Sequence, residues 1–329
     1  MTGREELLDV RGLKTHFFLE EGTVKAVDGV DFKVFRGQSL GIVGESGCGK
    51  SVTALSIMQL LPVPPGRIVG GEIWYHHNGT AVDLATLRPN SKRMRSIRGA
   101  EIAMIFQEPM NSLSPVHSIG VQIIEAIRLH HKMGRREAKE RTIEMLRKVK
   151  IPRPDLVVNE YPHHLSGGMR QRAMIAVALS CDPALLIADE PTTALDVTVQ
   201  AQILKLISEL QEELGTGLML ITHDLGVIAQ TVDQVAVVYL GKVVEYGAVV
   251  SVFKRPLHPY TRALFNSIPK LEGRQRLRPI QGSVPDPYKV IVGCPFRDRC
   301  TERRPRCESD EVPELVEVES GHLVRCFRG

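Results

Sequence analysis

The chain has 329 residues, of which 43% are hydrophobic, enough to bury one large core with a smaller unit appended to it. Lys and Arg total 42 against 38 Asp and Glu, and the resulting formal charge of +4 is too small to indicate a dedicated nucleic-acid binder. Segment 1–10 is charged, which argues against a secretory signal, and acidic residues interrupt the most apolar region, 217–240, which argues against a membrane span. Six cysteines without an export signal predict a reducing, cytoplasmic environment.

Short apolar runs rich in Val, Ile and Leu alternate with helical patterns along the first three quarters of the chain. Such runs are typical of buried parallel strands, and they predict an α/β core. The expected core strands are 39–43, 102–106, 184–188 and 218–222, with the last strands of the core over 235–246. Between 118 and 150 the pattern is charged and helical, and it ends at the proline-containing breaker 151–154. We therefore expect a helical subdomain, over about 110–180, inserted into the core.

The composition changes near residue 255. Prolines then punctuate a basic stretch with weak patterning, and four cysteines follow it. We predict a nucleotide-binding domain over 1–255 and a C-terminal extension over 256–329.

A glycine-rich loop follows the apolar run 39–43 and precedes a helical pattern, which is the context of a phosphate-binding loop. Its glycines allow backbone amides to turn toward phosphate oxygens, and the following helix adds its positive end. We expect Lys50 to reach the β- and γ-phosphates and the Ser51 hydroxyl to bind Mg²⁺. The predicted ATP-binding residues here are Gly44, Glu45, Ser46, Gly47, Cys48, Gly49, Lys50, Ser51 and Val52.

Two carboxylates, Asp189 and Glu190, end the apolar run 184–188. Ligands bind at the carboxyl ends of strands in open α/β sheets, so both acids are expected beside the phosphate loop. Asp189 would hold Mg²⁺ through water, and Glu190 would polarise the attacking water. An acid pair alone is weak evidence, because many such pairs are solvated strand ends.

The segment Leu165-Ser166-Gly167-Gly168-Met169-Arg170-Gln171-Arg172 resembles the signature motif of ATP-binding-cassette (ABC) subunits. Other elements of that family follow in its order: Gln107 matches the Q-loop, Leu195-Asp196 the D-loop, and His223 the switch histidine. The resemblance implies a RecA-like P-loop NTPase fold.

The resemblance also implies how two subunits share ATP. Ser166 can cap a helix whose first amides remain free to bind an anion. In the family, this helix contacts the γ-phosphate held by the facing subunit, so Ser166, Gly167 and Gly168 are expected at ATP, and Ser166, Gly168 and Asp196 at the dimer interface. By the same resemblance His223 senses the γ-phosphate, and Gln107 links Mg²⁺ to the membrane partner. The expected catalytic residues are Lys50, Glu190 and His223.

An aromatic residue before the phosphate loop stacks on adenine in this family, and Phe17 best fits the spacing. The alternative is that Phe17 belongs to the core.

Three segments resemble the D-type ATPases of oligopeptide and dipeptide importers: 107–115, 165–172, where Met169 replaces a commoner glutamine, and 257–261. This resemblance implies ATP-driven uptake of peptides at the cytoplasmic face of a membrane, with a peripheral ATPase. The implied partners are a second ATPase, either an F-type paralogue or another copy, two membrane permeases and an extracellular solute-binding protein. Oligosaccharides or nickel are alternative solutes.

Four thiols lie within one short unit: Cys294, Cys300, Cys307 and Cys326. They suggest a closed metal site, and thiolates suit zinc or iron–sulfur. Paired Cys-x-x-Cys motifs are absent from this sequence, and the resembling tails carry a [4Fe–4S] cluster, so we favour iron–sulfur over Zn²⁺. Disulfides or unligated thiols are the remaining possibility.

Two other functions compete with the importer. A soluble ABC ATPase could act on nucleic acid or ribosomes, but the long coiled coil and the second cassette typical of such relatives are absent from the sequence. A scaffold that binds ATP without hydrolysing it is disfavoured because Glu190 and His223 are both present. No nucleic-acid partner is expected.

Overall fold

The computed structural model describes residues 5–108, 112–193, 195–267, 280–289 and 291–327. Its main element is an eight-stranded sheet with the order β11-β12-β10-β9-β3-β8-β7-β6. The pairs β9–β3, β3–β8, β8–β7 and β7–β6 are parallel, and those joining β9, β10, β12 and β11 are antiparallel. The bounds are β3 (Ser39–Val43), β6 (Ile102–Ile105), β7 (Leu185–Asp189), β8 (Gly217–Ile221), β9 (Gln234–Tyr239), β10 (Lys242–Ala248), β11 (Val316–Glu319) and β12 (His322–Val324).

The predicted core strands are confirmed, each to within one residue at either end except that 235–246 divides into β9 and β10. They form where expected because their residues are buried throughout, as parallel strands covered on both faces require.

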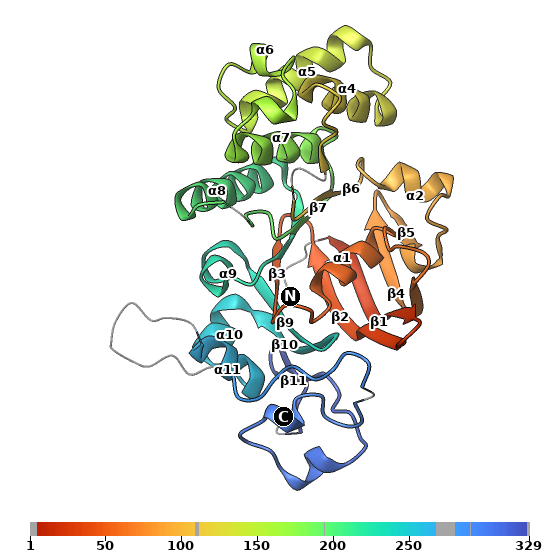
Figure 1. Ribbon diagram of the computed structural model, residues 1–329, viewed down its shortest axis with the longest axis vertical. Helices are drawn as coiled ribbons and strands as arrows, with labels where there is room; N and C mark the ends of the chain where they lie inside the picture. The colour runs from red at the N-terminus through yellow and green to blue at the C-terminus, as the bar shows by residue number, and fades with distance from the viewer. Residues whose placement is uncertain (1–4, 109–111, 194, 268–279, 290, 328–329) are drawn as a thin grey trace.

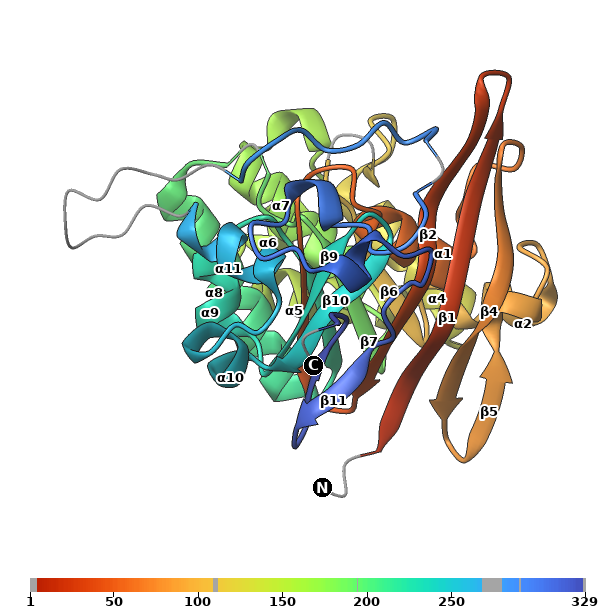
Figure 2. The same ribbon diagram turned by 90° about the horizontal axis from the view of Figure 1, so that it is seen from below.

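A second, antiparallel sheet flanks the first one, with the order β2-β1-β4-β5. Its strands are β1 (Glu6–Leu19), β2 (Gly22–Phe35), β4 (Gly66–His77) and β5 (Thr80–Asp83). Figure 2 shows this sheet on one side of the core sheet and most of the helices on the other.

The α-helices cover both faces of the core sheet (Figure 1). The bounds are α1 (Lys50–Ile57), α2 (Lys92–Ile97), α4 (Ile119–His130), α5 (Arg135–Lys148), α6 (Pro154–Val157), α7 (Gly167–Leu179), α8 (Val197–Leu214), α9 (Leu225–Thr231), α10 (Val249–Lys254) and α11 (Pro259–Asn266). Short 3-10 turns lie at Leu84–Thr86, Pro162–His164, Arg297–Arg299 and Pro305–Glu308. Helices α4, α5, α6 and α7 form one group at the end of the molecule shown at the top of Figure 1, where the helical subdomain is expected.

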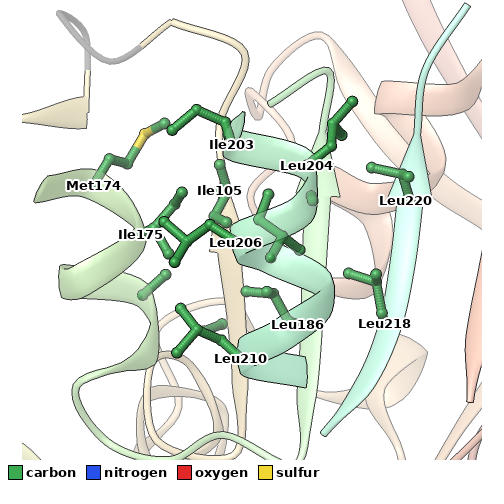
Figure 3. Close-up of a cluster of buried hydrophobic side chains, with 14 of the residues drawn as sticks. Ile105, Met174, Ile175, Leu186, Ile203, Leu204, Leu206, Leu210, Leu218 and Leu220 are labelled. Atoms are coloured by element: carbon green, nitrogen blue, oxygen red, sulfur yellow. The ribbon is translucent and has the colours of Figure 1, made fainter. Parts of the chain in front are cut away.

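Side chains that alternate along the core strands supply two hydrophobic clusters. On β7, Leu185 and Ile187 join the cluster beneath the antiparallel sheet, whereas Leu186 joins the cluster beneath the helices. Figure 3 shows Leu186 beside Leu206 and Leu210 of α8. Fully burying each such leucine contributes about 2 kcal/mol, so these clusters hold the sheet in place beneath the loops at its carboxyl edge.

The C-terminal extension after residue 255, called the tail below, is joined to the core sheet, because β12 pairs with β10. Beneath this junction, the fully buried carboxylate of Glu245 accepts hydrogen bonds from the backbone amides of Leu257 and His258, and it lies 2.8 Å from Nε2 of His322. Residues on both sides of position 255 therefore share one buried polar group. The exact domain boundaries stay a prediction. Among the described residues, no helix has both the length and the apolar character needed to cross a bilayer.

Candidate functional site

The phosphate loop connects β3 to α1, as predicted. Gly49 precedes the helix with a φ of 101°, and a Cβ there would lie 2.2 Å from the carbonyl oxygen of Ala26, so only glycine fits. The Lys50 side chain is buried, and its ammonium donates hydrogen bonds to the carbonyl oxygens of Gly44 (2.9 Å) and Glu45 (3.0 Å). The loop therefore wraps around a cation at the amino terminus of a helix, an arrangement suited to phosphate.

Ser51 and Asp189 meet beside this loop. The Ser51 hydroxyl donates a hydrogen bond of 3.0 Å to Oδ1 of Asp189, which lies at the carboxyl end of β7. Burial raises the pKa of the Asp189 carboxyl group, and the hydrogen bond from Ser51 acts in the opposite direction. A hydroxyl and a carboxylate in one place are the hard oxygen donors that Mg²⁺ prefers, so these side chains fit the predicted metal.

The carboxylate of Glu190 is the centre of a polar cluster. Gln107 donates to its Oε2 through Nε2 (3.2 Å), Thr193 donates to the same oxygen through Oγ1 (3.0 Å), and Nδ1 of His223 lies 3.4 Å from Oε1. Gln107 follows β6, Glu190 follows β7 and His223 follows β8, and neighbouring parallel strands end at the same edge of the sheet. The structure thus brings together three residues that the sequence predicted separately.

The Glu190 backbone is held in an uncommon conformation. Its φ is 45°, in the left-handed region, which costs a non-glycine residue about 1–2 kcal/mol. The Glu190 amide donates to the carbonyl of Ile221 (2.9 Å), which anchors the residue to β8. The fold therefore fixes this carboxylate against a local preference, as functional sites often do.

The signature segment begins α7 as predicted. The Ser166 side chain accepts a hydrogen bond from the amide of Met169 (3.4 Å), and α7 starts at Gly167. Ser166 is exposed, whereas Gln171 is buried and donates to the carbonyl of Pro191, the residue after Glu190. Asp196 is the exposed N-cap of α8 and accepts from Val199 (3.0 Å). The roles of Ser166, Gly168 and Asp196 between subunits stay predictions.

Phe17 is partly buried on β1, and a Cβ built at Gly66 would lie 3.0 Å from its ring. The ring therefore packs against β4. Stacking of Phe17 on adenine stays a prediction.

The four tail cysteines share one neighbourhood without forming a ready metal site. Cys294 and Cys307 are buried, and Cys300 and Cys326 are partly buried. Burial raises the pKa of the Cys294 thiol to about 11, and the nearby thiols of Cys307, Cys326 and Cys300 act in the same direction. Within the described ranges, however, no group of three or more His, Cys, Asp or Glu side chains is placed to hold a metal ion. The donor chemistry suits a thiophilic metal, but the placement does not yet support one.

Three residues near the site were missed by sequence reasoning. Thr193 contacts Glu190, while Tyr260 and Arg299 of the tail contact the phosphate loop at Glu45. Thr193 could have been suspected from its position beside the acid pair. No spacing rule points to the other two, because 215 and 254 positions separate them from Glu45.

Solved structures of related fold identify the class of protein. The chain superposes on a dimeric structure of MJ0796, described as a bacterial ABC transporter cassette, with a TM-score of 0.64 and 25% identity, covering 74% of this chain and 98% of that one. The fold and the site therefore define an ATP-binding-cassette ATPase, as the sequence predicted.

Sequence comparisons give the family. The family model for ABC transporters matches residues 27–193, and the model for the C-terminal region of oligopeptide/dipeptide transporters matches 244–307. A probable peptide ABC transporter ATP-binding protein, y4tR of Sinorhizobium fredii, is 54% identical over 98% of this chain and 95% of its own length. The oligopeptide transport ATP-binding protein AppD of Bacillus subtilis is 49% identical over 98% and 96%. The chain belongs to the ABC transporter family, among its oligopeptide/dipeptide ATP-binding subunits.

Proposed function

We propose that this chain hydrolyses ATP to drive the uptake of peptides, as the D-type ATPase of an importer. The names of the two relatives and the C-terminal family match support peptides as the solute. The observation that carries the proposal is the meeting of Gln107, Glu190 and His223 at the edge of the sheet where the phosphate loop begins.

The residues at this edge of the sheet have separate roles in ATP hydrolysis. Lys50 and the loop amides bind the β- and γ-phosphates, and Ser51, Gln107 and, through water, Asp189 would hold Mg²⁺. When bound, Mg²⁺ neutralises the charge that develops on the phosphates. Glu190 accepts a hydrogen bond from the attacking water and orients it, because its carboxylate is fixed by Gln107 and Thr193. His223 lies beside the other carboxylate oxygen of Glu190, and in this proposal its imidazole contacts the γ-phosphate.

ATP also joins two subunits in this proposal. Ser166, Gly167 and Gly168 begin a helix whose free amides contact the γ-phosphate on the facing subunit, and Asp196 bridges the two subunits. The exposure of Ser166 and Asp196 in the single chain supports this role. Hydrolysis removes the shared phosphate, so binding and hydrolysis close and open the pair.

The proposed assembly has the chain at the cytoplasmic face of a membrane. An F-type paralogue, or a second copy, is the facing ATPase; two permeases cross the bilayer, and an extracellular protein delivers the peptide. Within the chain, we propose a nucleotide-binding domain over 1–255, with its helical subdomain over about 110–180, and an extension over 256–329.

We further propose that Cys294, Cys300, Cys307 and Cys326 bind a [4Fe–4S] cluster, or Zn²⁺, once their loops close around it. The effect of Cys307, Cys326 and Cys300 on the pKa of the Cys294 thiol supports the idea, because it requires all three to lie near Cys294. Anaerobic purification followed by metal analysis and absorption near 400 nm tests it. Protein that contains neither iron nor zinc under these conditions would remove the proposal.

The hydrolytic role is tested with Glu190→Gln in the complex purified from its native membrane. Glu213→Gln is the matched control, since Glu213 is an exposed residue of α8 paired with Lys148. We expect the first variant to bind ATP but lose steady ATP hydrolysis, and the control to keep both. Equal turnover in Glu190→Gln would exclude Glu190 from the chemistry.

The transport role is tested by placing the same complexes in vesicles with a labelled peptide and its binding protein. ATP-dependent accumulation is expected with the control and none with Glu190→Gln. Identification of the co-purifying proteins gives an independent check, because ribosomal or nucleic-acid partners in place of permeases would favour a soluble ABC ATPase.

A further inference from the structure

Two tail residues hold the phosphate loop from its outer side. The backbone amide of Glu45 donates a hydrogen bond of 3.0 Å to the Tyr260 hydroxyl. The Arg299 guanidinium donates two hydrogen bonds to the Glu45 carboxylate, at 2.7 and 3.0 Å. Tyr260 is fully buried and Arg299 is 7% exposed, whereas the Glu45 side chain is 25% exposed, so this contact is only partly accessible to solvent. Glu45, the second residue of the loop, is thus hydrogen-bonded to the tail through both its backbone amide and its side-chain carboxylate.

The Arg299 side chain is itself fixed. Its Nε donates to the carbonyl of Gln281 (3.0 Å), and its guanidinium lies 5.7 Å from the centre of the Tyr239 ring. A planar guanidinium bound at several of its donors presents a rigid fork to the carboxylate. Removing Glu45 would leave the buried Arg299 charge without a partner, so a substitution at this pair should have a larger effect than one at a surface ion pair.

Glu45 also makes hydrogen bonds to other residues of the phosphate loop. Its carbonyl accepts hydrogen bonds from the Lys50 ammonium (3.0 Å) and from the amide of Cys48 (3.3 Å). One residue therefore joins the tail on one side to the phosphate-binding lysine on the other. A loop held at this point has fewer conformations to lose when it closes around phosphate.

The same residues connect the phosphate loop to residues 294–307, which carry Cys294, Cys300 and Cys307 and are called the cysteine segment below. Arg299 immediately precedes Cys300, on the 3-10 turn Arg297–Arg299. Phe296, two residues after Cys294, packs against the rings of Tyr239 (5.2 Å between centroids) and Tyr260 (5.4 Å). Cys294 and Phe296 lie in the same hydrophobic cluster as both tyrosines. A rearrangement of the cysteine segment would therefore move Arg299 and Tyr260, whose side chains bind Glu45.

We propose that Arg299 is a positioning residue of the ATP site: through Glu45 it keeps the phosphate loop in its binding shape and couples the order of the cysteine segment to ATP affinity. The inference rests on the proposed function only in that the loop must bind ATP. It gives the tail a role in the nucleotide cycle, separate from contacts with membrane partners.

The test compares the full-length wild type with R299Q, using ATP that carries a fluorescent N-methylanthraniloyl group. We expect Kd for this nucleotide to rise about tenfold in R299Q. R299K keeps the charge but not the fork, and is expected to recover part of the affinity. R306Q is the matched control, because Arg306 lies in the same tail but is exposed, and its side chain pairs there with Glu311 and the Phe327 ring. Its Kd should equal that of the wild type.

A double-mutant cycle identifies Glu45 as the route. E45Q alone is expected to weaken binding, and E45Q combined with R299Q should weaken it no further than the stronger single variant. In the native complex, R299Q should raise KM for ATP about tenfold while kcat changes less than about twofold, since Glu190 and His223 are untouched.

Stability measurements separate positioning from a structural role. R299Q with a lower melting temperature but unchanged Kd would overturn the proposal, as would fully additive effects in the cycle. If R299Q does not fold, E45Q provides the test from the other side of the contact, because it replaces the carboxylate that accepts both hydrogen bonds from Arg299, and unchanged Kd in that variant refutes the inference. Wild-type protein that binds no ATP would refute the proposed function instead.

Discussion

His258 should make the stability of the protein depend on pH. Its side chain is 2% exposed, and Nδ1 accepts a hydrogen bond from the Tyr260 amide (3.0 Å), which caps α11. Burial, together with the charge of Arg262, lowers the pKa of His258 to about 3, against the weaker opposing effect of a hydrogen bond with the Arg325 backbone. The folded protein therefore holds this imidazole neutral over the whole physiological range.

The sign and size follow from proton linkage. A histidine in the unfolded chain has a pKa of about 6.5, so below that value the unfolded state binds a proton that the folded state does not. Stability is complete above about pH 6.5 and falls by about 1.4 kcal/mol per unit as the pH drops toward 3. At about pH 5 the loss from this group alone is about 2 kcal/mol.

The assay is urea unfolding, followed by circular dichroism, of the wild type and His258→Asn between about pH 5 and 7.5. Asparagine keeps an acceptor for the helix cap but does not titrate. Both proteins share every other titrating group, so the wild type should lose about 2 kcal/mol more than the variant over this range. Parallel pH profiles for the two proteins would refute the reasoning.

Three further predictions concern packing and capping. Ser166→Ala should destabilise α7 by about 1 kcal/mol and weaken ATP-dependent dimerisation measured by gel filtration; an unchanged dimer would argue against the shared-phosphate role. Gly120→Ala places a Cβ 2.4 Å from the carbonyl oxygen of Val158, so the free energy of unfolding should fall by about 1–3 kcal/mol, whereas Gly134→Ala, in open space at the N-cap of α5, should lower it by less than about 1 kcal/mol. Leu206→Ala should cost about 2–5 kcal/mol in urea unfolding, and a smaller loss would mean that the cluster collapses around the cavity.

The buried parallel strands could be located from the sequence because nearly every residue along them is apolar or small; polar side chains such as Asp189 and Gln234 stand only at strand ends. The run at 39–43 is buried throughout, and the phosphate loop after it has spacing that few other structures require. The meeting of Glu190 with His223 could be expected for a related reason, since parallel strands end at one edge.

Other parts of the fold could not be found in this way. Bulges in the pairing of β1 with β2 interrupt the two-residue period, so 6–35 carries no clean alternation. Strand β11 is exposed along its length and therefore has no apolar signal. The contact of Arg299 with Glu45 could not be predicted, because nothing in the sequence distinguishes Arg299 from the other arginines of the basic tail.

The pairing of β12 with β10 has a consequence for anyone who shortens the protein. Cutting the chain after residue 255 would leave β10 as an unpaired strand edge, open to pairing with the next molecule, and would remove His322 and the two backbone amides that neutralise Glu245. A truncated version is thus expected to precipitate or be degraded in cells. The tail thus covers one edge of the core sheet, and the fold of the ATPase is complete only when the tail is present.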